Sequence, residues 1–175
     1  MRIVVLQLLL GLASLILLAA PAVPAPVRVR CEGTQCQEFD VVERQFVREG
    51  KDGTLIWTRT LAWTQDGLQR LSPSEERGHV FCSTTRPALI TTENGATAAV
   101  MLAPLSEWEY AQSPDLYLKY FETCHDAGTK VATGRDKVAR ELGYRVLRVN
   151  MSRPLGLTKP ESIFYFPASN RRDRP

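Results

Sequence analysis

The sequence lacks the short motifs that mark the commonest hydrolases and nucleotide-binding enzymes. It contains no G-x-S-x-G nucleophile elbow, no H-E-x-x-H zinc helix and no G-x-x-x-x-G-K phosphate loop. It also lacks a strong excess of one charge, because 22 basic residues face 19 acidic ones and the formal net charge is +3. Nucleic-acid-binding proteins carry clustered positive charge. We therefore expect no nucleic-acid partner.

Long apolar segments are missing after the N-terminus. The only long run covers residues 3–20 and is followed by a small, proline-spaced segment over residues 21–26. This order predicts a secretory signal peptide over residues 1–22, with a retained membrane anchor as the alternative. The next apolar stretch, residues 96–105, has about half of the roughly 20 residues that span a bilayer. We expect a periplasmic or secreted protein that touches a membrane only through an uncleaved signal segment.

Cysteines are few, but their number is even. Cys31, Cys36, Cys82 and Cys124 all follow the predicted signal peptide, and an even count in an exported chain favours disulfides. Of the three ways to pair them, Cys31 with Cys36 is local and leaves Cys82 with Cys124 as the long-range bridge. A metal on Cys31 and Cys36 is the alternative, but no second close cysteine pair completes a zinc spacing. We expect two disulfides, no metal and no cofactor.

The predicted domain organisation is simple. Removing 22 of the 175 residues leaves 153, a normal size for one domain. We assign residues 23–37 to an N-terminal segment, 38–169 to the globular domain and 170–175 to a basic, disordered tail. The elements follow the order strands, helices, strands, which predicts a single small α+β domain with a mostly antiparallel sheet and two short helices. The 17 arginines against 5 lysines suggest a GC-rich, bacterial coding sequence.

Turn signals divide the first part of the globular domain into strands. Two extended segments between residues 38 and 64 flank the glycine-rich residues 50–53, which predicts a hairpin. Residues 72–76 are expected to form a loop or one helical turn. Further strands are expected at 79–83, 88–92 and 97–103, with Asn94-Gly95 as a tight turn. In the extended segment that follows residues 50–53, we expect the side chains of one face to belong to the core: Leu55, Trp57, Leu61 and Trp63.

Two helices and two strands are expected in the second part. Ser113 and Pro114 predict a helix start. A second helix is expected from Thr133 to Leu142, with a capping box to Asp136 and a stop at Gly143. Residues 144–149 and 162–166 are expected to be strands. The inward face of the first helix is predicted to be Leu116, Tyr120, Phe121 and Cys124.

His125 and Asp126 are the candidate catalytic residues. The imidazole could act as a general base oriented by the neighbouring carboxylate, and a free cysteine beside a histidine could act as a nucleophile. Either arrangement would make the protein a cell-envelope hydrolase. The alternative is that His125 only stabilises the end of a helix through its dipole.

Two further groups are candidate ligand-binding residues. The polar run Ser83, Thr84, Thr85 and Arg86 includes an arginine that could bind a carboxylate or phosphate. Its alternative role is to cap a kinked edge strand. Trp108 and Tyr110 alternate with two glutamates and could bind a glycan, although aromatic residues more often fill cores.

These patterns together favour a non-catalytic binding or interaction domain. This interpretation depends on the expected exported domain having many secondary-structure signals and no assembled catalytic motif. Its partner would be an envelope or extracellular protein or a small ligand. The alternatives are the hydrolase built on His125 and Asp126 or a free cysteine, and an anionic-ligand or glycan-binding module.

Overall fold

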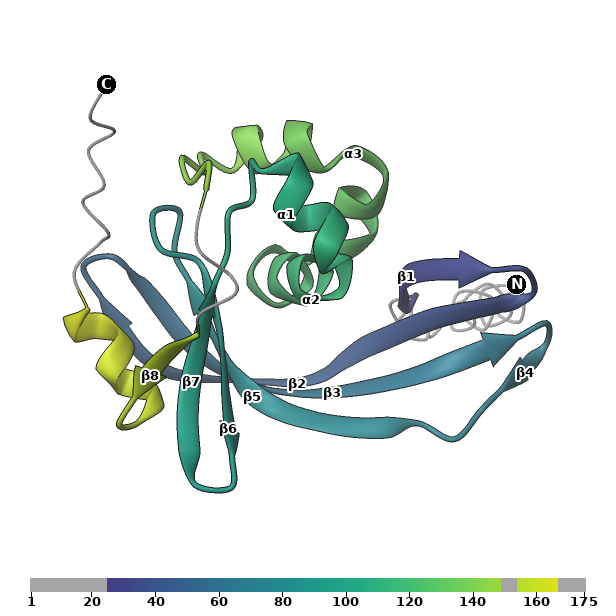
Figure 1. Cartoon of the computed structure of the whole chain (residues 1–175), viewed down its shortest axis with the longest axis horizontal. Coiled ribbons are helices and arrows are strands. Elements are labelled where there is room, and N and C mark those ends of the chain that lie inside the picture. The colour runs from purple at the N-terminus through teal and green to yellow at the C-terminus, as the bar shows by residue number, and fades with distance from the viewer. Residues whose placement is uncertain (1–24, 149–153, 167–175) are drawn as a thin grey trace, which may run out of the picture.

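The computed structural model describes residues 25–148 and 154–166. These residues form one antiparallel sheet of eight strands, and three short α-helices lie together over one of its faces (Figure 1). None of the helices in these two ranges is long and apolar enough to cross a bilayer. The predicted signal peptide and the basic tail lie outside the described residues. The expected antiparallel sheet with short helices is confirmed.

The elements follow the chain in the order strands, helices, strand and 3-10 helix. Their bounds are β1 (Val27–Glu32), β2 (Gln35–Gly50), β3 (Gly53–Asp66), β4 (Gln69–Arg70), β5 (Ser74–Cys82), β6 (Ala88–Glu93), β7 (Ala96–Met101), α1 (Glu107–Gln112), α2 (Pro114–His125), α3 (Gly128–Glu141), β8 (Leu155–Leu157) and the 3-10 helix η1 (Pro160–Tyr165). The strand order in the sheet is β1-β2-β3-β5-β6-β7-β8, and β4 pairs with β3.

The long hairpin of β2 and β3 is the centre of the fold. The two strands pair from Gln35 opposite Asp66 to Gly50 opposite Gly53, which confirms the hairpin around residues 50–53. Gly53 is required at the turn, because a Cβ there would lie 2.4 Å from the Cys82 carbonyl oxygen. Within the predicted N-terminal segment 23–37, residues 27–32 form β1 and residues 35–37 begin β2 of the same sheet.

Two hydrophobic clusters lie on opposite faces of the sheet, because neighbouring residues of a strand point to opposite sides. Val80 of β5 belongs to the cluster beneath α2 and α3, together with Phe39 and Phe121. Phe81 belongs to the second cluster, which includes Ile163 of η1. The sheet therefore has a helix face and an opposite face, and each is covered over only part of its length.

The face of β3 that was predicted to belong to the core is buried near both ends of the strand but only partly buried in the middle. Leu55 and Trp63 are buried, but Trp57 and Leu61 are only partly buried. These side chains lie on the face opposite the helices, where η1 covers only the Leu55 end. The fully buried positions in the middle of the strand are Thr58 and Thr60, which belong to the helix face.

The predicted helix at Pro114 is confirmed as α2, although the Ser113 side chain forms no cap hydrogen bond. The second helix was expected to begin at Thr133. Instead α3 begins at Gly128 and is kinked at Gly134, and the Thr133 hydroxyl bonds to the Lys130 carbonyl rather than forming a capping box. Helix α1 was not predicted.

Three other expectations are wrong. Residues 74–76, expected in a loop or helical turn, begin β5. Residues 144–148 form no strand, and residue 149 lies outside the described ranges. The strand expected at 162–166 is largely replaced by η1. Strand β8 lies between the two expected strands, where no strand was predicted. Short apolar runs fit a strand and a helical turn equally well, and Pro160 supplies the fixed φ that starts a helix.

Candidate functional site

A groove with a volume of about 620 Å³ lies on the helix face of the described structure. It lies between the start of α2 and the end of the sheet made by β1, β2 and β3, which Figure 1 shows extending beyond the helices. Its volume is in the range of ordinary ligand sites. We call this hollow the α2 groove, and we define it by Val29, Phe39, Ala62, Leu71, Ser72 and Gln112, together with the charged residues described next.

The α2 groove combines an apolar floor with walls of both charges. The side chain of Phe39 is buried on the helix face of β2. Glu76 of β5 and Lys119 of α2 form an ion pair of 2.6 Å across one wall. Arg30 of β1 donates a hydrogen bond of 3.1 Å to Gln37 on another wall. The groove can thus offer hydrogen-bond donors, acceptors and charges of both signs to one occupant.

A second hollow of about 290 Å³ lies where β2 meets the corner between α2 and α3. Its centre is Arg44, which forms ion pairs with Glu122 (3.2 Å) and Asp126 (3.0 Å). The other carboxylate oxygen of Glu122 accepts the Gly128 backbone N–H at 2.9 Å. These charges hold the corner of the two helices onto the sheet. Within the described ranges, no group of three or more His, Cys, Asp or Glu residues is placed to hold a metal ion.

His125, one candidate catalytic residue, begins a buried chain of hydrogen bonds. Its Nε2 lies 2.6 Å from the Tyr144 hydroxyl, which donates to the Tyr120 hydroxyl at 2.9 Å. The Tyr120 hydroxyl donates to the Ser83 carbonyl at 3.1 Å and accepts the Ser83 N–H at 3.0 Å. Since each hydroxyl has one proton to give, the direction of the chain assigns a proton to Nε2 of His125.

The electrostatics of this chain favour neutral groups. Burial lowers the pKa of His125, and the nearby Asp126 carboxylate opposes this only in part. Burial also raises the pKa values of Tyr120 and Tyr144. Asp126 pairs with Arg44, and no hydrogen bond joins it to His125 in the described structure. The two candidate residues are adjacent, but they do not form an imidazole oriented by a carboxylate.

All four cysteines form the two expected disulfides. Cys31 is bonded to Cys36 across the β1–β2 turn, and Cys82 is bonded to Cys124, which ties β5 to α2. The pairing favoured by sequence separation is confirmed. None of these thiols is free, so a thiol nucleophile would require reduction of a disulfide. The intramolecular disulfides indicate an oxidising setting, extracellular or periplasmic.

The polar run from Ser83 to Arg86 forms a tight turn after β5. The Ser83 hydroxyl accepts the backbone N–H groups of Thr85 (3.3 Å) and Arg86 (3.1 Å). The Arg86 guanidinium is buried, pairs with Asp52 at 3.0 Å and donates to the Phe166 carbonyl. It thereby connects the β2–β3 turn to the end of η1. Ligand binding at this run stays a prediction, and a ligand would have to displace these contacts.

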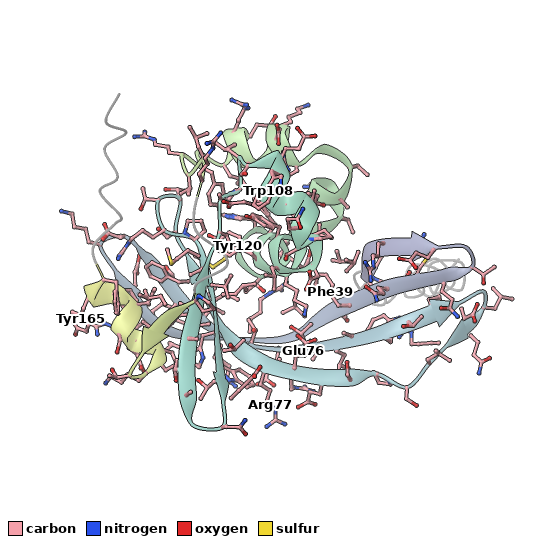
Figure 2. All side chains as sticks on the ribbon, viewed as in Figure 1. Phe39, Glu76, Arg77, Trp108, Tyr120 and Tyr165 are labelled. Atoms are coloured by element: carbon pink, nitrogen blue, oxygen red, sulfur yellow. A yellow bond between two sulfur atoms is a disulfide. The ribbon has the colours of Figure 1, made fainter. Side chains whose placement is uncertain are left out.

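The structure does not bring Trp108 and Tyr110 together. Both lie in α1, and two residues correspond to a rotation of about 200° around a helix. Trp108 is 70% exposed, and Figure 2 shows it on the outside of the helices. Tyr110 packs against Tyr117 at 5.6 Å and beneath the Arg135 guanidinium at 4.9 Å. A glycan stacked on both rings is therefore not supported by their placement, and Trp108 is the more accessible of the two.

The residues of the α2 groove were not identified from the sequence. They come from five segments: β1, β2, β3, residues 71–76 at the start of β5, and residues 112–119 from the end of α1 into α2. Each segment reads on its own as ordinary strand, loop or helix end. Helix α1, which supplies Gln112, gave no recognised start signal, although Ser106 caps it by accepting the Glu109 N–H. Comparisons with protein-family models, curated proteins and solved structures find no match to this chain.

Proposed function

We propose that this protein is an exported, non-catalytic binding domain, acting in the periplasm or outside the cell, and that the α2 groove is its binding surface. The observation that carries the proposal is the composition of the groove: an apolar floor at Val29, Ala62 and Leu71 between walls that hold charges of both signs. Two disulfides suit a domain that works in an oxidising setting.

A segment of polypeptide is the occupant that fits this composition. An extended chain presents a carbonyl and an N–H at each residue, and these need both donors and acceptors in the surrounding walls. Gln112, Ser72 and Gln37 supply both kinds of group, and the floor can take an apolar side chain. Glu76 and Lys119 can each exchange their mutual ion pair for a charged group of the occupant.

The hydrolase built on His125 and Asp126 has no comparable support. The imidazole is hydrogen-bonded to Tyr144 and the carboxylate is paired with Arg44. Catalysis by this pair would require both contacts to open before the histidine could take a proton from a nucleophile. We therefore put forward binding as the function and keep catalysis outside the proposal.

The test is to select binding peptides and ask where they bind. Random 12-residue peptides displayed on phage are selected on the immobilised protein, and the affinity of the best peptide is measured by calorimetry. Gln112→Trp places a large side chain in the groove, whereas Ala132→Trp places one on an exposed position of α3 outside it. We expect Gln112→Trp to weaken binding by about tenfold or more, a loss of about 1.4 kcal/mol, and Ala132→Trp to leave it unchanged.

Two outcomes contradict the proposal. One is that no peptide is enriched over a control surface. The other is that the enriched peptides bind the Gln112→Trp and Ala132→Trp variants equally well. A parallel measurement with acidic and neutral oligosaccharides tests the glycan alternative at Trp108, because Trp108→Ala would then reduce binding while Gln112→Trp would not.

A further inference from the structure

One edge of β5 has no strand beside it. β5 pairs with β3 along its whole length, from Ser74 opposite Ala62 to Cys82 opposite Thr54. Its other edge pairs with β6 only at residues 79–81. Beyond this point β6 continues beside β7 alone, and Figure 1 shows the β6–β7 hairpin turning away from β5. Residues 74–78 of the described sheet therefore present an open row of backbone N–H and C=O groups.

This edge is more regular than the open edge of β2. Residues 40–50 of β2 also lack a strand on one side, but the pairing of β2 with β3 shifts register twice in this stretch. Such irregularities twist an edge and hinder its pairing with another chain. The pairing of β5 with β3 has no register shift. Of these two edges, β5 is the better template for an added strand.

The residues along the β5 edge are complementary to themselves. We propose that a second copy of this chain pairs antiparallel with residues 74–78, centred on Glu76, so that one continuous sheet runs through both copies. In this register Glu75 lies opposite Arg77 of the second copy, and Arg77 lies opposite Glu75 of the second copy. Ser74 lies opposite Gly78, so the ends of the paired stretch carry small side chains. Opposite charges on directly paired residues stabilise a sheet.

The centre of the pairing brings two Glu76 carboxylates together. Each of them already forms an ion pair of 2.6 Å with Lys119 of its own chain, so the two pairs add no net charge. Figure 2 shows Glu76 and Arg77 on opposite faces of β5, in agreement with the alternation of a strand. The glutamate–arginine pairs therefore form on the face away from the helices, and the two Glu76–Lys119 pairs meet on the helix face.

Neighbouring registers that keep the helix faces of both copies on one side are less favourable. Centring the pair on Glu75 places two glutamates opposite each other and supplies no opposite-charge pair between the copies, although each Glu75 is paired with Arg59 and Arg77 of its own chain. Centring it on Arg77 places two arginines opposite each other. Only the register on Glu76 supplies two opposite-charge pairs, and like charges directly opposite each other destabilise a sheet. Glu76 and Lys119 also line the α2 groove, so the two surfaces meet there, but the register is set by Glu75 and Arg77 on the opposite face and does not depend on what the groove binds.

The experiment measures self-association of the exported protein by sedimentation equilibrium. We expect the wild-type protein to form a dimer, and Glu75→Arg or Arg77→Glu alone to weaken it by about tenfold or more, because each change creates two like-charge pairs. The first variant has arginine at both positions and the second has glutamate at both. A 1:1 mixture of the two variants should therefore form a heterodimer that neither forms with itself.

The mixture separates loss of the interface from loss of the fold. Both substitutions alter ion pairs within one chain, since Glu75 is paired with Arg77 at 2.6 Å and with Arg59 at 3.5 Å, and mixing does not repair these. If a dimer forms again on mixing, the restored interaction must be a contact between the two different chains. The inference is overturned if the wild-type protein is monomeric at the highest attainable concentration, if either single variant dimerises as well as the wild type, or if the mixture stays monomeric.

Discussion

The Nε2 atom of His125 and the hydroxyl oxygen of Tyr144 are 2.6 Å apart and form the outer end of a buried hydrogen-bonded chain. The chain continues through Tyr120 to the backbone of Ser83, directly after the Cys82–Cys124 disulfide. A covalent bond and a polar network thus join α2 to the end of β5 at the same place. Two of the residues expected to perform chemistry or to bind a ligand, His125 and Ser83, are the two ends of this structural connection.

Replacing Tyr120 should destabilise the fold more than replacing Tyr144. The Tyr120 hydroxyl bonds both the N–H and the carbonyl of Ser83, and Tyr120→Phe leaves these buried groups without that partner. Each unsatisfied buried group costs about 1–3 kcal/mol, so we expect a loss of about 2–4 kcal/mol for Tyr120→Phe and about 1–2 kcal/mol for Tyr144→Phe. Urea unfolding measures both. Equal losses, or a larger loss for Tyr144→Phe, would contradict this role of Tyr120.

Acidification should destabilise the protein before its carboxyl groups titrate. Burial lowers the pKa values of both histidines of the chain, His79 and His125, below their value in the unfolded state, about 6.5. Between the folded and unfolded pKa values, the unfolded chain binds more protons, so the free energy of unfolding falls as the pH falls. The stabilisation is complete above about pH 7.5 and is lost progressively as the pH decreases through about 6.5. Urea unfolding at a series of pH values measures this slope.

The control for the pH prediction is a pair of glutamine variants. Glutamine has an amide N–H that can replace the donor of His125 toward Tyr144, but it does not titrate. His125→Gln and His79→Gln should each reduce the slope between about pH 5 and 7.5, and the double variant should flatten it. A slope that persists in the double variant would assign the pH dependence to other groups.

Removing the Arg86 side chain should loosen η1 more than the rest of the molecule. The guanidinium is buried and joins Asp52 of the β2–β3 turn to the carbonyl groups at the end of η1. Arg86→Met keeps much of the apolar volume but removes charged hydrogen bonds, which are worth about 1.5–3 kcal/mol each. We expect faster amide hydrogen exchange in residues 160–166, with little change in α2. Exchange that increases equally in both regions would contradict a local role, and Asp52→Asn should give the same pattern more weakly.

Local signals predicted those parts of the fold that depend on a few adjacent residues. Asn94 and Gly95 both have positive φ, 51° and 80°, as the expected tight turn requires. Pro114 starts α2, and the local pairing of Cys31 with Cys36 left the correct long disulfide. In each case the backbone preference or the chain separation of the residues themselves decides the outcome.

The remaining features depend on contacts between distant segments. Arg86 reads as a surface group, but it is buried because η1 and Asp52, far away in the sequence, close around it. Trp57 and Leu61 alternate as core residues would, yet η1 covers only one end of their face. The α2 groove combines five segments of chain, and no single segment carries a pattern that marks it. Periodicity reports which side chains share a face, but not what covers that face.

The two disulfides should differ in their contribution to stability. In the chain-entropy account, the stabilisation grows with the number of residues between the bonded cysteines. Cys82 and Cys124 are separated by 42 positions and Cys31 and Cys36 by 5, which gives about 4 and about 2 kcal/mol respectively. We therefore expect the paired replacement Cys82→Ala with Cys124→Ala to destabilise the protein about twice as much as Cys31→Ala with Cys36→Ala, as measured by urea unfolding. The long disulfide also lies beside the buried chain from His125 to Ser83, so its loss should speed hydrogen exchange in α2, whereas loss of the short one should affect only β1 and the start of β2. If the short disulfide proves the more stabilising, the end of the sheet that borders the α2 groove, rather than the junction of α2 with β5, is the part of the fold that most needs a covalent constraint.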